Sequence, residues 1–297
     1  MKFSLFAAGL LFFCFFTNCN TTSKPETQTE TENLQTAMSN NLKVMTYNMR
    51  LDVASDGENA WPNRKDFFTS QVLFLEPDIL GVQEARPNQI EDLNASLKNY
   101  KFIGTGRDGE KKGEYSAIYY NSEKIKVEQE NTFWLSQTPN EMSQGWDAAY
   151  PRICTYGLFT VLENNQKIWV FNTHLDHQGA EAQKEGMKLI LEKIQSVNTN
   201  DFPVVITGDF NVEPNSEVIA YTTNSFHDTK NLAAITFGSE GTFNGFKYNE
   251  PATRRIDYIL LSKSTNLSVK KYAVFSSAVD FKYPSDHFPV FVELEFK

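Results

Sequence analysis

The chain has 297 residues, 40% of them hydrophobic, which is enough for one large α/β domain or two smaller ones. Its 28 lysines and arginines against 37 aspartates and glutamates give a formal charge of −9, which argues against a protein that holds nucleic acid over a broad basic surface. A basic rim around a local site is still compatible with this balance.

The first 40 residues indicate export. Lys2 precedes an apolar run, residues 3–16, that is too short to span a membrane comfortably, and Cys19 follows closely. This order resembles a bacterial lipoprotein signal, so we interpret 1–18 as the signal peptide, Cys19 as the lipidated residue and 19–40 as a disordered polar tether. A plain secretory signal and an uncleaved anchor are the alternatives. We expect a cell-envelope lipoprotein, or otherwise a periplasmic or extracellular protein, that reaches the membrane only through a lipid on Cys19.

Residues 41–297 are predicted to form one domain in which apolar strands alternate with amphipathic helices. Its first half contains, in order, a strand from residue 42 to Asn48, a helix from Trp61 to just before Pro77, a strand over 78–84, a helix over 87–97, and strands over 115–120 and 125–130. A basic loop over 104–113 separates two of these elements. The irregular aromatic stretch 131–151 would line a cleft or cover the core.

The second half of the domain continues this alternation. It contains, in order, a hairpin of strands over 152–162 and 167–174, a helix over 178–197, a strand over 204–208, a short helix over 214–221, a long loop over 222–252, strands over 254–261 and 267–275, and a last strand after His287. The strand 204–208 delivers Asp209 and Asn211 to its carboxyl end, where open α/β sheets place their ligands. Asp257 in the apolar middle of 254–261 is costly unless it is paired.

Polar residues stand at or beside the ends of these buried strands, and we expect them to converge on one site. Each alone has an ordinary structural explanation, such as a turn, a salt bridge or a buried histidine bonded to a carbonyl. Together they are harder to explain that way, because clustered polar groups are stable only when they bond to each other or to a metal. The residues are Asn48, Glu84, His174, Asp209, Asn211, Asp257, Asp286 and His287.

The residue types favour an oxygen-ligated divalent cation and hydrolysis. The domain has four histidines and a single cysteine, Cys154, which argues against a structural zinc site and excludes a disulfide within the domain. Oxygen ligands such as Glu84 and Asn48 favour Mg²⁺ or Mn²⁺. The sequence has no Gly-x-Ser-x-Gly elbow, P-loop or dinucleotide-binding turn, so attack by an activated water remains.

The ordered motifs resemble those of the endonuclease/exonuclease/phosphatase superfamily, the DNase I-like metal-dependent phosphoesterases. The resemblance spans residues 42–297. It implies a four-layer α/β sandwich in which two mixed β-sheets pack face to face with helices on the outside. The matching segments are Tyr47-Asn48, Gln83-Glu84, Thr173-His174-Leu175, Gly208-Asp209-Phe210-Asn211, Arg255-Ile256-Asp257-Tyr258 and Ser285-Asp286-His287.

The resemblance also implies roles for individual residues. Glu84 would be the principal metal ligand, with Asn48 nearby and Asp286 completing the shell. Asp209 would position or deprotonate the attacking water, and Asn211 would hold that water or a phosphate oxygen.

His287, paired with Asp257, would act as a base or stabilise the charge that develops on phosphorus, and His174 would hydrogen-bond the scissile phosphate. Tyr115 and Arg152 are candidate phosphate contacts. The other candidate phosphate clamps, for which solvated surface charge is the alternative, are Arg50, Arg64 and Arg107.

We therefore predict a secreted or lipid-anchored, Mg²⁺- or Mn²⁺-dependent monomeric hydrolase that cleaves a phosphodiester by in-line attack of water. The alternatives are a secreted nuclease acting on DNA or RNA, a phosphomonoesterase, and a non-catalytic surface binding protein on the same fold. The acidic charge favours a small substrate, a lipid or sugar phosphate, or a short nucleic acid strand over a long duplex.

Overall fold

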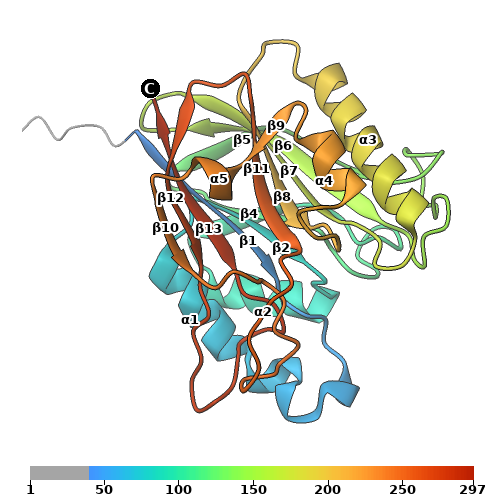
Figure 1. The fold of residues 1–297 in the computed structure, drawn as a ribbon, viewed down its shortest axis with the longest axis vertical. Coiled ribbons are helices and arrows are strands. Elements are labelled where there is room, and N and C mark those ends of the chain that lie inside the picture. The colour runs from blue at the N-terminus through green and yellow to red at the C-terminus, as the bar shows by residue number, and fades with distance from the viewer. Residues whose placement is uncertain (1–39) are drawn as a thin grey trace, which may run out of the picture. The chain divides into compact units, whose positions relative to one another are not determined.

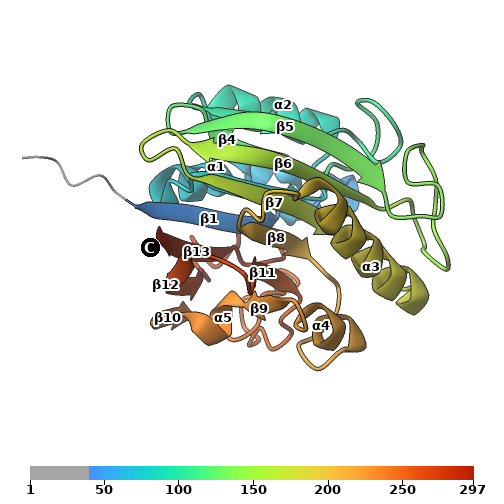
Figure 2. The ribbon, with the colours of Figure 1, turned by 90° about the horizontal axis from the view of Figure 1, so that it is seen from above.

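The computed structural model describes residues 40–297, which fold into two β-sheets packed against each other (Figure 1, Figure 2). The predicted signal peptide 1–18, the predicted lipidation site Cys19 and the predicted tether 19–40, apart from Asn40, lie outside the described residues. All strands and helices assigned within the described residues fall in the predicted domain, 41–297.

Both sheets of the described residues are mixed. One has seven strands, in the order β10 (Ile235–Gly238), β12 (Leu267–Val274), β13 (Val290–Phe296), β1 (Asn41–Asn48), β2 (Ile79–Gln83), β4 (Ile118–Asn121) and β3 (Tyr100–Ile103). The other has six strands, in the order β5 (Ile125–Trp134), β6 (Ile153–Val161), β7 (Lys167–His174), β8 (Val204–Asp209), β11 (Asp257–Ser262) and β9 (Phe226–Asp228). In each sheet the central pairing is parallel, β1 with β2 and β7 with β8.

Helices cover the outer face of each sheet. The α-helices are α1 (Lys65–Leu75), α2 (Pro87–Ser96), α3 (Ala180–Val197), α4 (Glu217–Thr222) and α5 (Thr229–Leu232), and two 3₁₀ helices span Ala54–Asn59 and Trp61–Asn63. α1 and α2 pack on the seven-stranded sheet, and α3 and α4 pack on the six-stranded sheet, on opposite sides of the strands in Figure 1. The predicted four-layer sandwich is therefore confirmed. No helix within residues 40–297 has the length and apolarity needed to cross a bilayer.

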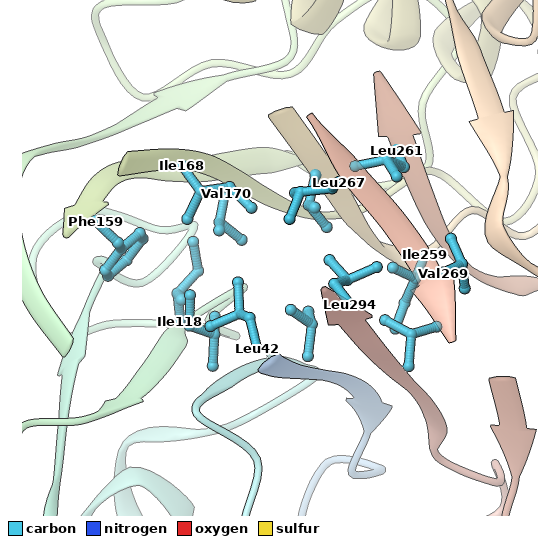
Figure 3. Packing of buried hydrophobic residues seen from close by; sticks show 14 of the residues in the cluster. Leu42, Ile118, Phe159, Ile168, Val170, Ile259, Leu261, Leu267, Val269 and Leu294 are labelled. Atoms are coloured by element: carbon cyan, nitrogen blue, oxygen red, sulfur yellow. The ribbon is translucent and has the colours of Figure 1, made fainter. Parts of the chain in front are cut away.

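The two inner sheet faces meet in an apolar layer. Figure 3 shows Leu42 and Leu294 of one sheet pointing toward Val170 and Ile259 of the other. Because side chains alternate between the two faces of a strand, every second residue belongs to this layer, and the residues between pack under the helices. Burial of apolar surface contributes roughly 25 cal/mol per Å², so this layer of aliphatic side chains stabilises the packing of one sheet on the other.

The same alternation explains where the polar strand ends point. Asn48 is four residues after Val44, and His174 is four residues after Val170, so both fall on the inner face of their sheets. Asp209 follows Val205 by the same spacing. The polar groups therefore meet between the sheets, at one end of the apolar layer.

Some elements differ from the sequence predictions. The predicted loop 222–252 contains β9, α5 and β10, and β3 was not predicted. These elements are three or four residues long, and every residue of β10 is exposed, so no apolar alternation marks them. The helix expected from Trp61 begins as a 3₁₀ turn before α1, and Asp257 is the first residue of β11 instead of lying in its middle.

Candidate active site

Asp209 stands at the centre of the polar cluster because of the strand pairing around it. In the parallel pairing of β7 with β8, His174 is opposite Asp209, and in the antiparallel pairing of β8 with β11, Asp257 is opposite Asp209. Paired residues on neighbouring strands lie about 5 Å apart, so the six-stranded sheet delivers an imidazole and two carboxylates side by side. The register of these three strands therefore brings His174, Asp209 and Asp257 together.

Asn48 connects this group to the seven-stranded sheet. Its Nδ2 atom donates hydrogen bonds to Glu84 Oε1 and to Asp209 Oδ2, both at 3.0 Å, and its Oδ1 atom accepts one from the backbone N–H of Arg50 at 3.0 Å. Asn48 is fully buried. The structure therefore places Asn48 beside the predicted metal ligand Glu84, with its amide nitrogen, not its oxygen, turned toward the carboxylates.

Unusual backbone geometry aims two of these side chains. Glu84 (φ 62°) and Asn211 (φ 54°) both adopt left-handed backbone, which is uncommon for residues other than glycine and is often found at functional sites. Gly208 allows β8 to approach β7, because a Cβ atom at this position would lie 2.1 Å from the carbonyl oxygen of Thr173. The close approach keeps Asp209 beside His174.

A buried polar layer beneath the site ties the sheets together. Asn172 of β7 donates from Nδ2 to the carbonyl oxygens of Val82 and Ala117, both at 2.9 Å, and its Oδ1 accepts from Gln83 Nε2 at 2.7 Å. Gly81 faces this layer, where a Cβ atom would lie 2.6 Å from Asn172 Oδ1. Sequence reasoning missed this layer, although Gln83 directly precedes Glu84 and Asn172 stands two residues before His174 in otherwise apolar strands.

His287 lies between two carboxylates. Its Nδ1 atom is 2.9 Å from Asp257 Oδ2, and its Nε2 atom is 3.7 Å from Asp209 Oδ2. Burial opposes protonation of His287, but the charges of Asp257 and Asp209 outweigh it and raise the pKa of the imidazole to about 10. Burial and the neighbouring charge of Asp257 raise the pKa of Asp209 to about 7. The His287 imidazole is therefore protonated at neutral pH.

His174 differs from His287 in its charge state. Asn211 Nδ2 lies 3.1 Å from the carbonyl oxygen of Leu175, which can only accept, so this amide atom is a donor, and it also lies 2.9 Å from His174 Nε2. Nε2 of His174 therefore accepts that hydrogen bond and carries no proton. Burial and the nearby charge of Arg152 lower the pKa of His174 well below its ordinary value, which agrees with a neutral ring.

The carboxylates fit a hard divalent cation. Ligand atoms of Glu84, His174 and Asp209 all lie within 4.8 Å of one another. Asp286 also faces Glu84, and burial together with the charge of Glu84 raises the pKa of Asp286 to about 6. The guanidinium of Arg50 lies 3.9 Å from Asp286 and 4.0 Å from Glu84, which is too far for a hydrogen bond. The negative charge of these two carboxylates is therefore incompletely neutralised by Arg50. A divalent cation bound by these oxygens would neutralise it.

Arg64 has a role that the sequence did not indicate. Its buried guanidinium donates to the carbonyl oxygens of Met49 at 2.6 Å, Arg50 at 2.7 Å, Asn59 at 2.8 Å and Pro284 at 3.0 Å. The suggestion that Arg64 is a phosphate clamp or a solvated surface charge is wrong, because the side chain is enclosed and engaged with backbone. It instead joins the segment after β1 to the segment that carries Asp286.

A cavity of about 570 Å³ opens above the cluster. The sequence-predicted residues that line it are Arg50, Glu84, Arg107, Arg152, His174, Asp209, Asn211, Asp286 and His287. Asn48 and Asp257 lie behind these residues and do not reach the cavity wall. Tyr115 is buried and lines a separate small recess behind Glu84 and His174. The structure thus brings together all eight residues expected to converge, and leaves Tyr115 outside the cavity.

Comparison with known proteins agrees with this geometry. The model of the Endonuclease/Exonuclease/phosphatase family matches residues 45–287. A mannosyl-6-phosphatase of Bacteroides thetaiotaomicron is 36% identical, with a TM-score of 0.82 over 86% of this chain and 100% of that chain. An endonuclease/exonuclease/phosphatase family protein of the same organism is 35% identical, with a TM-score of 0.82 over 86% of this chain and 98% of that chain.

A more distant relative is an uncharacterized protein of Acanthamoeba polyphaga mimivirus, 29% identical over 161 residues, or 52% of this chain. The chain spans about 60% of the length of the curated relatives it matches. The family match covers every residue from the first motif to the last, and the strand ends in that span form a single cluster. The chain belongs to the Endonuclease/Exonuclease/phosphatase family of phosphoesterases.

Proposed function

We propose that this chain is a Mg²⁺- or Mn²⁺-dependent phosphomonoesterase that removes phosphate from a phosphorylated sugar. The observation that carries the proposal is His287 held between Asp257 and Asp209 at the floor of a cavity that also presents Glu84 and Asp286. The volume of about 570 Å³ lies in the range of small-molecule sites. Similarity to the mannosyl-6-phosphatase, at 36% identity, supports a sugar phosphate as substrate.

The chain's own residues supply positioning and proton handling. Asp257 fixes His287 through Nδ1, so that Nε2 faces Asp209 and the cavity floor. In this position the protonated imidazole would donate to an oxygen of the scissile phosphate, while Asp209 would orient the attacking water and receive its proton.

Glu84 and Asp286 would hold the cation, which neutralises phosphate oxygens when bound. Neutral His174, bonded through Nε2 to Asn211, adds no charge to the floor of the cavity. Asn211 also bonds to the carbonyl oxygen of Leu175, so its amide keeps His174 in one orientation beside Asp209.

Our sequence prediction favoured a phosphodiester, and the sugar monoester is preferred here because of the relative named above. The two are separated by a direct comparison of substrates. The purified protein would be assayed with mannose 6-phosphate, bis-p-nitrophenyl phosphate, plasmid DNA and oligo-RNA, each with Mg²⁺ and with EDTA. We expect Mg²⁺-dependent release of phosphate from mannose 6-phosphate, with a kcat/KM at least about tenfold above that for the diesters.

Each other result would change the proposal in a definite way. Faster cleavage of the diester than of mannose 6-phosphate would establish a phosphodiesterase, and cleavage of DNA or RNA a nuclease. Hydrolysis of none of them, with cation binding intact, would favour a binding protein on the same fold. His287→Ala should lower kcat about 10²-fold or more, while His227→Ala, outside the cavity lining, serves as the matched control.

We also propose that the protein acts in the cell envelope as a lipoprotein attached through Cys19. The support is the order of a basic residue, an apolar run and a cysteine at the start of the chain. Cells expressing the full chain would be labelled with palmitate, and Cys19→Ala should abolish labelling. Labelling that persists in Cys19→Ala, or a wild-type chain without label, would contradict attachment through this residue.

A further inference from the structure

One wall of the cavity consists of residues that the roles above do not use. Arg107 and Glu114 come from the basic loop and its end, and Tyr150 comes from the aromatic stretch 131–151. Arg152 and His177 complete the wall. The loop and the aromatic stretch are far apart in the sequence, yet they meet at the side of the same cavity as the catalytic cluster.

Arg107 and Glu114 form a fixed pair in this wall. The guanidinium is bound at two points, from Nη2 to Glu114 Oε1 at 2.8 Å and from Nη1 to Glu114 Oε2 at 2.9 Å. The backbone carbonyl of Arg107 accepts a hydrogen bond from Trp134 Nε1 at 2.7 Å, which anchors the loop. A bidentate pair of this kind has a defined orientation, and both of its residues line the cavity.

Tyr150 joins this pair to the rest of the wall. The Arg107 guanidinium lies 4.9 Å from the centroid of the Tyr150 ring, and the His177 ring stacks on Tyr150 at 5.9 Å with an interplanar angle of 14°. His177 Nδ1 is 3.1 Å from Arg152 Nη2. Because arginine can only donate, His177 Nδ1 is the acceptor in this contact. Tyr150 is 50% exposed and lines the cavity.

The charge on this wall is balanced. Arg107 is neutralised by Glu114, and Arg152 is neutralised by Asp176, whose Oδ2 is 3.2 Å from Arg152 Nε. A second phosphate of a polyphosphorylated substrate or of a nucleic acid needs an unpaired cation, and neither of these arginines provides one. Hydroxyl groups, in contrast, are both donors and acceptors and suit a paired carboxylate and guanidinium beside an amphipathic ring.

We propose that Arg107, Glu114, Tyr150 and His177 form the subsite for the neutral, hydroxylated ring of the sugar whose phosphate is removed. This inference rests on the proposed function and adds the part of the substrate that the wall recognises. Catalytic residues at the floor would bind the phosphate, and the wall would contact the sugar ring.

The test separates recognition of the ring from hydrolysis of the phosphate. Ethyl phosphate has the same kind of leaving group as mannose 6-phosphate, a primary alcohol, but lacks the ring. We expect Tyr150→Ala to lower kcat/KM for mannose 6-phosphate about tenfold, mainly through KM, and to change kcat/KM for ethyl phosphate less than about twofold. The matched control is Tyr248→Ala, because Tyr248 is 45% exposed but does not line the cavity.

Glu114→Gln tests the charge balance. Releasing Arg107 from its carboxylate should weaken binding of mannose 6-phosphate. The affinity for mannose 1,6-bisphosphate, divided by the affinity for mannose 6-phosphate, should rise by about tenfold or more. Melting temperatures of all variants identify a change that merely unfolds the protein; if Glu114→Gln unfolds, the exposed Tyr150→Ala decides alone.

The outcomes distinguish this inference from the proposed function. If ethyl phosphate and mannose 6-phosphate are both untouched by the wild type, the proposed activity fails, and calorimetric binding of mannose 6-phosphate to the wild type and to Tyr150→Ala then decides the subsite. The subsite is overturned if Tyr150→Ala affects both phosphates equally, if binding is unchanged, or if adenosine monophosphate is preferred over mannose 6-phosphate and that preference depends on Tyr150.

Discussion

Asp257 stands directly opposite Asp209 in the antiparallel pairing of β11 with β8, so two buried carboxylates face the same imidazole, that of His287. One of the two bonds to Nδ1 of His287, and the other lies near Nε2. The two carboxylates therefore have different roles. Asp257 sets the tautomer and charge of His287, whereas Asp209 lines the cavity.

Replacing Asp257→Asn should therefore lower the activity and shift its pH dependence. Without the Asp257 charge, the pKa of His287, which the two carboxylates raise to about 10, falls, so the protonated imidazole is lost at a lower pH. We expect kcat to fall about 10²-fold and the alkaline limb of the kcat profile to move to lower pH. Profiles of wild type and variant from acid to alkaline pH would check this. An unchanged alkaline limb would mean that His287 does not act as the acid.

Removing the cation should abolish activity and lower thermal stability together. A cation that binds only the folded chain stabilises it by about 2.7 kcal/mol at a concentration one hundred times its dissociation constant. We therefore expect Mg²⁺ or Mn²⁺ to raise the melting temperature of the wild type, and Glu84→Gln to lose most of this increase. Glu141→Gln, an exposed change outside the cavity, should keep it. A full increase in Glu84→Gln would exclude Glu84 as a ligand.

Arg64→Met should reduce both stability and activity. The substitution leaves four carbonyl oxygens without their donor, and we expect a loss of about 2–4 kcal/mol in the free energy of unfolding. Arg64→Lys should recover little, because one ammonium group cannot reproduce a planar fork that reaches several carbonyls. Urea unfolding measures the first effect, and kcat at saturating metal measures the second. The control is Lys98→Met, since Lys98 is exposed and lies outside the cavity lining.

Asp176 should make stability depend on pH in the acid range. Burial opposes its ionisation, but backbone N–H groups of Gly179, Gln178 and Ala149, with Arg152, hold the pKa of Asp176 at about 2. The ionised group therefore stabilises the fold above its unfolded pKa, near 4, and this contribution is lost as the pH falls toward 2.

We expect Asp176→Asn to cost about 2 kcal/mol near neutral pH and progressively less below about pH 4. Urea unfolding of wild type and variant at a series of pH values would measure the difference. A difference that stays constant down to the acid range would show that the charge of Asp176 contributes nothing and that only its shape is required.

Much of the fold and of the site could be predicted because polar residues interrupt apolar strands at regular places. Asp209 and His174 each end a buried run, and the strand period then fixes the face on which they lie. The order of the motifs added the family and, with it, the sandwich. The strands, the faces of their side chains and the polar residues at their ends could therefore be predicted from local sequence patterns.

The remaining features depend on contacts between distant segments. Arg64 precedes an amphipathic helix and looks like a surface charge, but it reaches the carbonyl oxygen of Pro284, 220 residues away. Asp176 is separated from His174 by one residue in the sequence, but its carboxylate binds Arg152 and the start of α3. The residues around Glu84 do not predict its left-handed backbone conformation. Such features appear only when the chain has folded.

The hydrogen bonds from Asn48 to Glu84 and Asp209 span the boundary between two sheets whose separation is set by apolar side chains that do not line the cavity. Adding or deleting a methyl group at Val44 or Val205 would alter the distance between catalytic groups without touching one of them. Substitutions in the apolar core can therefore adapt the protein to a different temperature. They would do so by changing the separation of the two sheets, and with it the geometry of the active site.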